Sequence, residues 1–189
     1  MEKDLVLGSE PVRAEDNSPL LQIFLEGLID IYWAEQQLLE AIPKMEAAAT
    51  TNELMNAMST HFSETKRHIT RLEKVFSLVN HPAKAKVCFA MEGLIREMES
   101  VLEETNESTM TRDAAIIMIA QKMEHYEIAT YGSLTEFAKT LGLTDVFGLL
   151  QLTFDEERMT DQGLTRIARN RIHWQADLEK ANELNQTLK

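Results

Sequence analysis

Residues 116–138 read IIMIAQKMEHYEIATYGSLTEFA, and this stretch decides the fold. Apolar side chains recur along it at the spacing of one helix face, which predicts a long amphipathic helix. Two acidic residues, Glu124 and Glu127, fall on that apolar face, whereas His125 and Tyr126 point to other sides of the helix. The stretch therefore predicts a buried helix face that carries two carboxylates.

Two further amphipathic stretches repeat this pattern of an acid on an apolar face. Glu35 lies near the middle of the apolar stripe in the first stretch of the chain. In the last stretch Glu157 lies near the centre of the stripe and Glu156 lies at its flank. Rotation of the helix by part of a turn exchanges these two residues, so both remain candidate inner-face acids.

The second amphipathic stretch places an imidazole and a carboxylate on one face. His61 lies within its apolar stripe, Glu64 lies at the edge, and His68 lies close by. Single histidines on apolar faces are usually hydrogen-bonded core residues, but residues at i−3 and i+4 from a carboxylate share its face. We therefore include His61 and Glu64 in the predicted site and leave His68 out of it.

Helix start and stop signals divide the chain into four long helices and one short one. Ser18-Pro19 opens the first helix, Asn80-His81-Pro82 ends the second, and Gly142 closes the third long helix. The expected helices cover about 19–49, 52–79, 89–105, 111–141 and 144–171. A short helix in one long crossover connection is typical of a ferritin-like bundle. The sequence thus predicts an all-α, ferritin-like four-helix bundle.

The chain is expected to form one domain, since its length is sufficient for a single core. Residues 1–18 contain Gly, Pro and mixed charge and are expected to be a flexible tail. Residues 19–171 are expected to form the bundle, and 172–189 a polar C-terminal extension.

Composition excludes several classes of function. The net charge of −12 argues against binding to nucleic acid or to an anionic membrane, because phosphate affinity needs a basic surface. Cys88 is the single cysteine, so no intrachain disulfide can form. We find neither a signal-peptide pattern nor a run of about 20 apolar residues. The expected location is the cytoplasm.

The predicted inner-face acids need a counter-charge. An unpaired buried carboxylate is very unfavourable, and no Lys or Arg lies near the centre of these stripes. Metal ions are the natural partners, and oxygen-rich ligands with one or two imidazoles favour iron or manganese over copper or structural zinc. Glu35 and Glu127 are expected to bridge two divalent ions, and Tyr131 either bonds Glu127 or is a core tyrosine. The structural alternative is that these acids lie at helix edges and reach water.

The sequence resembles the YciE/YciF-type ferritin-like stress proteins of bacteria over about 20–168. The matching runs are Tyr32–Leu39 (YWAEQQLL), His61–Thr65 (HFSET), Cys88–Leu94 (CFAMEGL), Lys122–Ala129 (KMEHYEIA) and Asp155–Glu157 (DEE). This resemblance implies a ferritin-like bundle, a homodimer, a dinuclear metal site and a link to stress conditions. The chain departs from other ferritin-like proteins, because its second long helix has the reversed order His61-x-x-Glu64 and its fourth has Thr160 where an imidazole is usual.

Two functional hypotheses follow. In the first, a di-iron or dimanganese centre held by Glu35, His61, Glu64, Glu124, Glu127 and either Glu156 or Glu157 reacts with peroxide or dioxygen. In the second, the chain is a non-enzymatic helical stress or interaction protein whose site is vestigial or sequesters metal. Metal stoichiometry followed by peroxide consumption separates the two.

Overall fold

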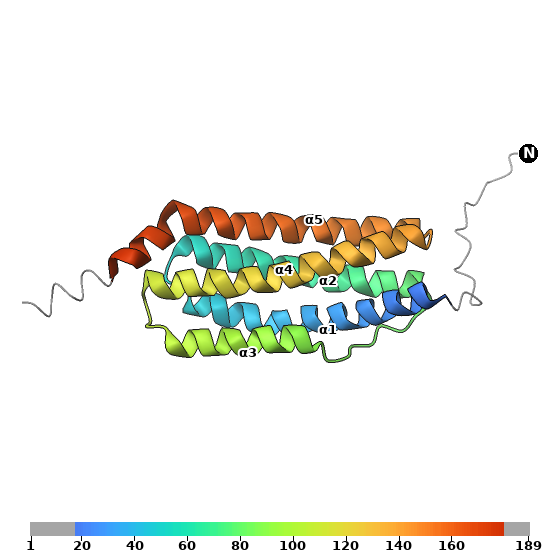
Figure 1. Ribbon diagram of the computed structural model, residues 1–189, viewed down its shortest axis with the longest axis horizontal. Helices are drawn as coiled ribbons and strands as arrows, with labels where there is room; N and C mark the ends of the chain where they lie inside the picture. The colour runs from blue at the N-terminus through green and yellow to red at the C-terminus, as the bar shows by residue number, and fades with distance from the viewer. Residues whose placement is uncertain (1–17, 180–189) are drawn as a thin grey trace, which may run out of the picture.

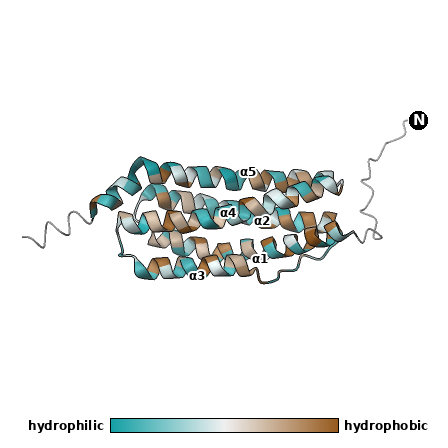
Figure 2. Ribbon diagram, viewed as in Figure 1, coloured by the Kyte–Doolittle hydropathy of each residue, from teal (hydrophilic) through white to brown (hydrophobic). Residues whose placement is uncertain are grey.

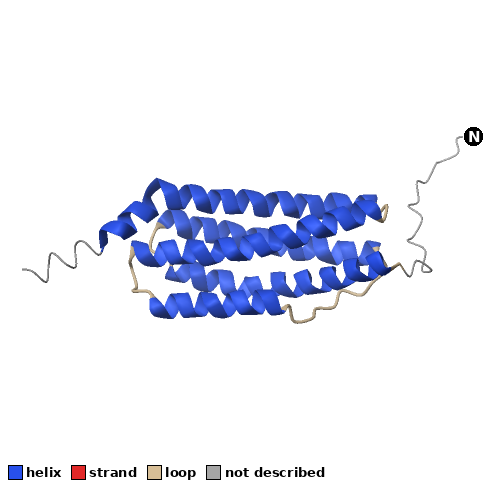
Figure 3. Cartoon of the chain, viewed as in Figure 1, coloured by secondary structure: helices blue, strands red, loops and turns tan. Residues whose placement is uncertain are grey.

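The computed structural model describes residues 18–179, which form helices joined by loops and contain no strand (Figure 3). The helices are α1 (Pro19–Ala48), α2 (Asn52–Leu78), α3 (Phe89–Glu104), α4 (Met110–Thr140), α5 (Thr144–Ile167) and a π-helical turn η1 (Ala168–Ile172). The predicted helices are confirmed to within a few residues at each end. The last helix resumes after η1 and continues to residue 179. Residues 1–17 of the predicted tail (residues 1–18) and residues 180–189 lie outside the described part.

Four long helices form the bundle, as predicted (Figure 1). In Figure 1, α1 and α5 run in one direction and α2 and α4 run in the other, so each neighbouring pair is antiparallel. Helix α1 packs on α2 and α4, and α5 packs on α4 and α2. The connection from α2 to α4 must cross the length of the bundle, and α3 lies within that crossover and packs outside α4 and α1. This is the ferritin-like arrangement.

The core of the bundle is largely apolar. Figure 2 shows hydrophilic and hydrophobic residues mixed along every helix, as expected for helices with one inward face. Completely buried side chains include Phe24, Leu28, Leu54, Phe76 and Ile116. No described helix combines the length and the apolar character that crossing a membrane requires.

Polar groups close the helix ends. The Ser18 hydroxyl accepts a hydrogen bond from the Leu21 amide and Pro19 occupies the first position of α1, as predicted. Helix α2 lacks a side-chain cap, and a residue of α4 binds the turn that precedes it. The Asp113 carboxylate accepts hydrogen bonds from the backbone N–H groups of Thr50 and Thr51, at 2.6 and 2.9 Å. Asp113 thereby fixes the turn between α1 and α2 onto α4.

Replacing Asp113 with Ala is expected to destabilise the metal-free fold by about 3 kcal/mol, because the buried Thr51 amide and the partly buried Thr50 amide lose a charged acceptor. Asp113→Asn keeps one acceptor oxygen in the same shape and should lose about half as much. Urea unfolding in the presence of a chelator measures both. Equal stability of Asp113→Ala and the wild-type chain would show that water satisfies these amides instead.

Candidate metal centre

Six titratable side chains from four helices converge at the middle of the bundle. Helix α1 supplies one acid, α2 two imidazoles, α4 two acids and α5 one acid: Glu35, His61, His68, Glu124, Glu127 and Glu157. The four carboxylates are completely buried, and the two imidazoles are no more than 2% exposed. The structure therefore places a fully enclosed acidic cluster where the sequence predicted inner-face acids.

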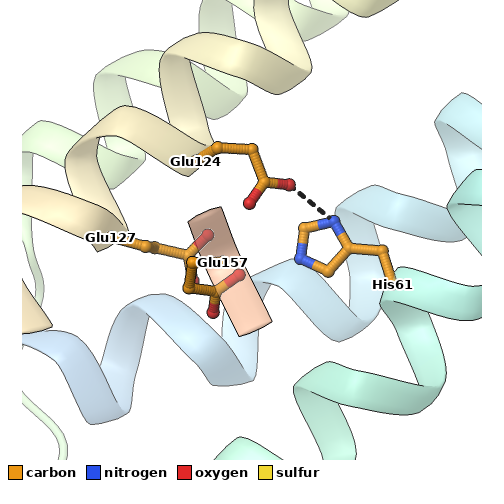
Figure 4. A group of neighbouring side chains, drawn as sticks. All are labelled: His61, Glu124, Glu127 and Glu157. Atoms are coloured by element: carbon orange, nitrogen blue, oxygen red, sulfur yellow. Dashed lines mark ion pairs between the residues drawn. The ribbon is translucent and has the colours of Figure 1, made fainter. Parts of the chain in front are cut away.

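These side chains form two overlapping groups. One contains His61, Glu124, Glu127 and Glu157, and the other contains Glu35, His68 and Glu157. Within each group, one potential ligand atom per residue lies within 4.8 Å of all the others. Figure 4 shows the first group, with the polar atoms of its four side chains pointing toward one another. Glu157 is the residue that the two groups share, whereas the sequence predicted that Glu35 and Glu127 would bridge two ions.

The contacts inside the cluster leave many polar atoms unsatisfied. The Nδ1 atom of His61 lies 2.9 Å from Glu124, and the Nδ1 atom of His68 lies 2.9 Å from Glu157. These pairs are close, but their angles are not those of hydrogen bonds. Neither oxygen of Glu124, Glu127 or Glu157 has a hydrogen-bond donor, and the same holds for the Nε2 atom of His61. Buried polar atoms without partners are rare, so this donor set fits cations placed between the side chains.

Burial governs the protonation of the carboxylates. It raises the pKa of Glu124 to about 8, although His61 opposes the shift. Burial also raises the pKa of Glu127 well above its usual value, and the neighbouring carboxylates Glu157 and Glu35 add to the effect. The pKa of Glu35 is raised by burial as well. Glu157 is the exception, because His68 and His61 more than offset its burial and lower its pKa.

Both imidazoles hold protons strongly. Burial lowers the pKa of His61, but Glu124 more than offsets it, so the pKa rises to about 9. For His68 the effect of burial is exceeded by contacts with Glu35 and Glu157, which raise the pKa to about 11. In the metal-free protein, protons therefore supply the positive charge of the cluster, and a metal must displace them to bind.

The structure separates the two neighbouring acids that the sequence left open. Glu157 lies inside both groups, whereas Glu156 lies beside the centre and binds Arg71 with both of its oxygens, at 2.5 and 2.8 Å. Hydrogen bonds from Arg71 lower the pKa of Glu156 to about 2. Glu156 also accepts a contact from Nε2 of His68 at 2.8 Å. A basic residue thus does reach the edge of the centre, which the apolar stripes did not reveal.

Glu64 lies outside both groups. Its side chain is 19% exposed and contacts the Nη2 atom of Arg67 at 3.4 Å. The Thr160 hydroxyl donates a hydrogen bond to its other oxygen at 3.3 Å. The helix-face argument put Glu64 at the edge of the stripe, and at that edge it turns toward α5 instead of the centre.

Two residues of the centre were missed or misassigned from the sequence. His68 is buried among Glu35, Glu156 and Glu157, and its seven-residue spacing from His61 was the available signal, because such residues differ by only about 20° around a helix. The Tyr131 hydroxyl donates to Glu35 at 2.5 Å. Of the two alternatives for Tyr131, the bond to Glu127 is wrong, since Glu127 has no hydrogen-bond donor, and the core tyrosine with a satisfied hydroxyl is confirmed.

Comparisons with known proteins find close relatives over most of the chain. A family described as a domain of unknown function (DUF892) matches residues 19–177. Protein YciF of Escherichia coli is 42% identical over 156 residues, which cover 82% of this chain and 93% of that protein.

Solved structures agree with this similarity. The crystal structure of the E. coli stress protein YciF matches with a TM-score of 0.77 and 41% identity, covering 82% of this chain and 97% of that one. YcfI, a putative structural protein from Rhodopseudomonas palustris, matches with a TM-score of 0.74 and 36% identity, covering 82% and 98%. A protein from Xanthomonas campestris at 18% identity shares the fold, with a TM-score of 0.67, over 86% of this chain and 99% of that one.

Proposed function

Because this chain belongs to the DUF892 family and is a relative of YciF, we propose that its buried centre binds two divalent metal ions, iron or manganese. One observation carries the proposal. Buried carboxylates from three helices have oxygens without hydrogen-bond partners, and they form two groups that both contain Glu157.

Charge supports two ions rather than one. Four fully buried carboxylates carry four negative charges when ionised, and two divalent cations balance them. His61 would complete the first group and His68 the second, both as neutral ligands. Carboxylate oxygens with one imidazole per ion suit iron and manganese, and the absence of thiolates among these donors disfavours structural zinc.

The surrounding residues would hold the ligands in place. The Tyr131 hydroxyl orients Glu35, and the Arg71–Glu156 pair orients His68 through its Nε2 atom. The burial of every ligand excludes bulk water from the centre. Bound iron or manganese would supply redox chemistry toward peroxide or dioxygen at this site.

We further propose that the chain acts in the bacterial stress response, since its relative YciF is described as a stress protein. Within that role there are two candidates. Reaction with peroxide or dioxygen is the first, and sequestration of metal without turnover is the second. The second is favoured by the complete burial of the carboxylates, which leaves a substrate little access to the ions.

Elemental analysis tests the proposed binding. Chain purified with chelator, loaded anaerobically with Fe²⁺ or with Mn²⁺ and then desalted, is expected to retain about two ions per chain. Consumption of peroxide by the loaded protein, and its loss in Glu127→Ala, would support the redox function. Retained metal with no peroxide consumption would support sequestration. A chain that stays metal-free under both loading conditions would refute the proposal.

A further inference from the structure

The enclosed centre raises the question of how an ion reaches it. If the proposed function holds, a cation must pass through the shell of helices, because all six side chains of the two groups are buried. Within the described part of the chain, a groove runs along the seam between α2 and α5 and reaches Glu64 and Thr160, which lie one turn from ligands of the centre. It has a volume of about 350 Å³ and is lined by Glu53, Ala57, Glu64, Met159, Thr160 and Gly163, among others.

The groove is large enough for a hydrated cation. Six water molecules at about 30 Å³ each occupy about 180 Å³, roughly half of the groove. Glu53 is exposed near the first turn of α2, and Glu64 lies about three turns further along the same helix. Two acids at different depths favour movement of a cation inward, and the negative net charge of the chain favours its approach.

The inner end of the groove meets the centre at Glu64 and Thr160. Glu64 lies one turn from His61 on α2, and Thr160 lies one turn from Glu157 on α5. These two residues are therefore the next layer outward from the ligands on both walls of the seam. Only two weak contacts hold Glu64 there, the 3.3 Å bond from Thr160 and the 3.4 Å contact with Arg67, whose side chain is 51% exposed.

Further along α2, strong hydrogen bonds join α2 to α5 across the same seam. There Arg71 binds both oxygens of Glu156 at 2.5 and 2.8 Å, and it also donates to the Thr153 hydroxyl. A bidentate pair between charged groups is much stronger than a single long hydrogen bond to a partly exposed acid. Opening is therefore easiest at the Glu64–Thr160 contact.

We propose that the α2–α5 groove is the route by which divalent cations reach the centre, and that Glu64 transfers them. Rotation of the Glu64 side chain breaks only its contacts with Thr160 and Arg67 and frees its oxygens to bind a cation in the groove. The carboxylate then binds the incoming cation and passes it to His61, one turn away on α2, and from there to Glu157 in the same ligand group. Glu64 acts in uptake and is not a permanent ligand.

Rapid mixing with Co²⁺, followed by its visible absorbance, tests this route, with equilibrium stoichiometry measured in parallel. Gly163→Trp fills the groove, since a Cβ at Gly163 meets no atom nearer than 3.8 Å. We expect this variant to take up Co²⁺ at least tenfold more slowly and to reach the wild-type stoichiometry. Glu64→Gln should slow uptake severalfold without lowering the final affinity. Gly148→Trp, also on α5 but outside the groove, is the matched control and should behave as wild type.

The outcomes separate this inference from the proposed function. Unchanged uptake rates in both Gly163→Trp and Glu64→Gln, with normal final loading, would overturn the route and leave the metal site standing. A lower stoichiometry or affinity in Glu64→Gln would show that Glu64 is a ligand, as the sequence predicted. A wild-type chain that binds no Co²⁺, Fe²⁺ or Mn²⁺ would overturn both proposals. Circular dichroism confirms that each variant is folded.

Discussion

Glu157→Gln is expected to abolish the binding of both metal ions. Glu157 is the one residue that belongs to both ligand groups, and the amide keeps its shape while removing its charge. Loss of a residue that only orients a ligand lowers metal affinity about 10- to 100-fold, so loss of a shared ligand should cost about 100-fold or more for each ion. Equilibrium dialysis against Mn²⁺, with elemental analysis, measures the effect.

Two further variants show whether the loss of metal is specific to Glu157 and to which ligand group each ion belongs. Asp155→Asn removes an exposed acid two residues away on α5 and should retain both ions. Glu124→Gln alters only the group around His61 and should cost one ion. If Glu157→Gln still retains both ions, Glu157 is not the bridging ligand and the assignment of the two groups is wrong. Loss of one ion would place Glu157 in a single group.

The second large effect concerns pH. Without metal, the stability of the fold should fall as pH rises from about 6.5 to 8.5. In the folded chain the pKa of His61 is about 9, against 6.5 ordinarily, and that of Glu124 is about 8, against 4.5. The native state therefore holds more protons than the unfolded chain in this window. Each excess proton lowers the free energy of unfolding by about 1.4 kcal/mol per pH unit.

Bound metal should remove this dependence. The ions keep His61 neutral and Glu124 ionised, and the unfolded chain is also deprotonated at both residues above about pH 6.5. Stability of the loaded protein should stay level, so the gap in Tm between loaded and metal-free protein should widen with pH. At a free ion concentration 1,000 times Kd each site adds about 4 kcal/mol. In a chain of this size, the stabilisation from one site raises the Tm by roughly 8–16 °C.

Thermal unfolding at several pH values, with anaerobic Mn²⁺ or with EDTA, measures both curves. Glu157→Gln is the control, because Mn²⁺ should not raise its Tm. Parallel pH dependence of the two wild-type curves would mean that metal does not displace protons from this cluster. That result would contradict binding at these residues even if the chain bound metal elsewhere.

Most of the fold could be predicted from the sequence. Helix periodicity, Ser18-Pro19 and Gly142 located the long helices to within a few residues. The presence of a short helix between α2 and α4 predicted the crossover. These signals are local, because a cap or an apolar stripe acts within one helix. The contribution of Asp113 to the start of α2 was not predictable, because it joins residues more than 60 positions apart.

The burial of the acids at the middle of the bundle could also be predicted from the sequence. The side chains that they contact on other helices could not. Glu35, Glu124 and Glu127 lie on the middle of their apolar stripes, and any bundle that buries those stripes buries these acids. Residues at the edge of a stripe are different. Whether Glu64 turns to the centre or to a neighbouring helix depends on the rotation of α2 against α5, which packing of both helices sets.

The sequence by itself thus determined that a helical bundle would bury carboxylates in its core without Lys or Arg residues to neutralise their charge. Only the tertiary structure decided that Glu157 is shared by two groups, that His68 joins the second and that Arg71 withdraws Glu156 from the centre. The physical reason is that periodicity fixes the direction of a side chain relative to its own helix. The relative rotation and depth of four packed helices fix which side chains meet.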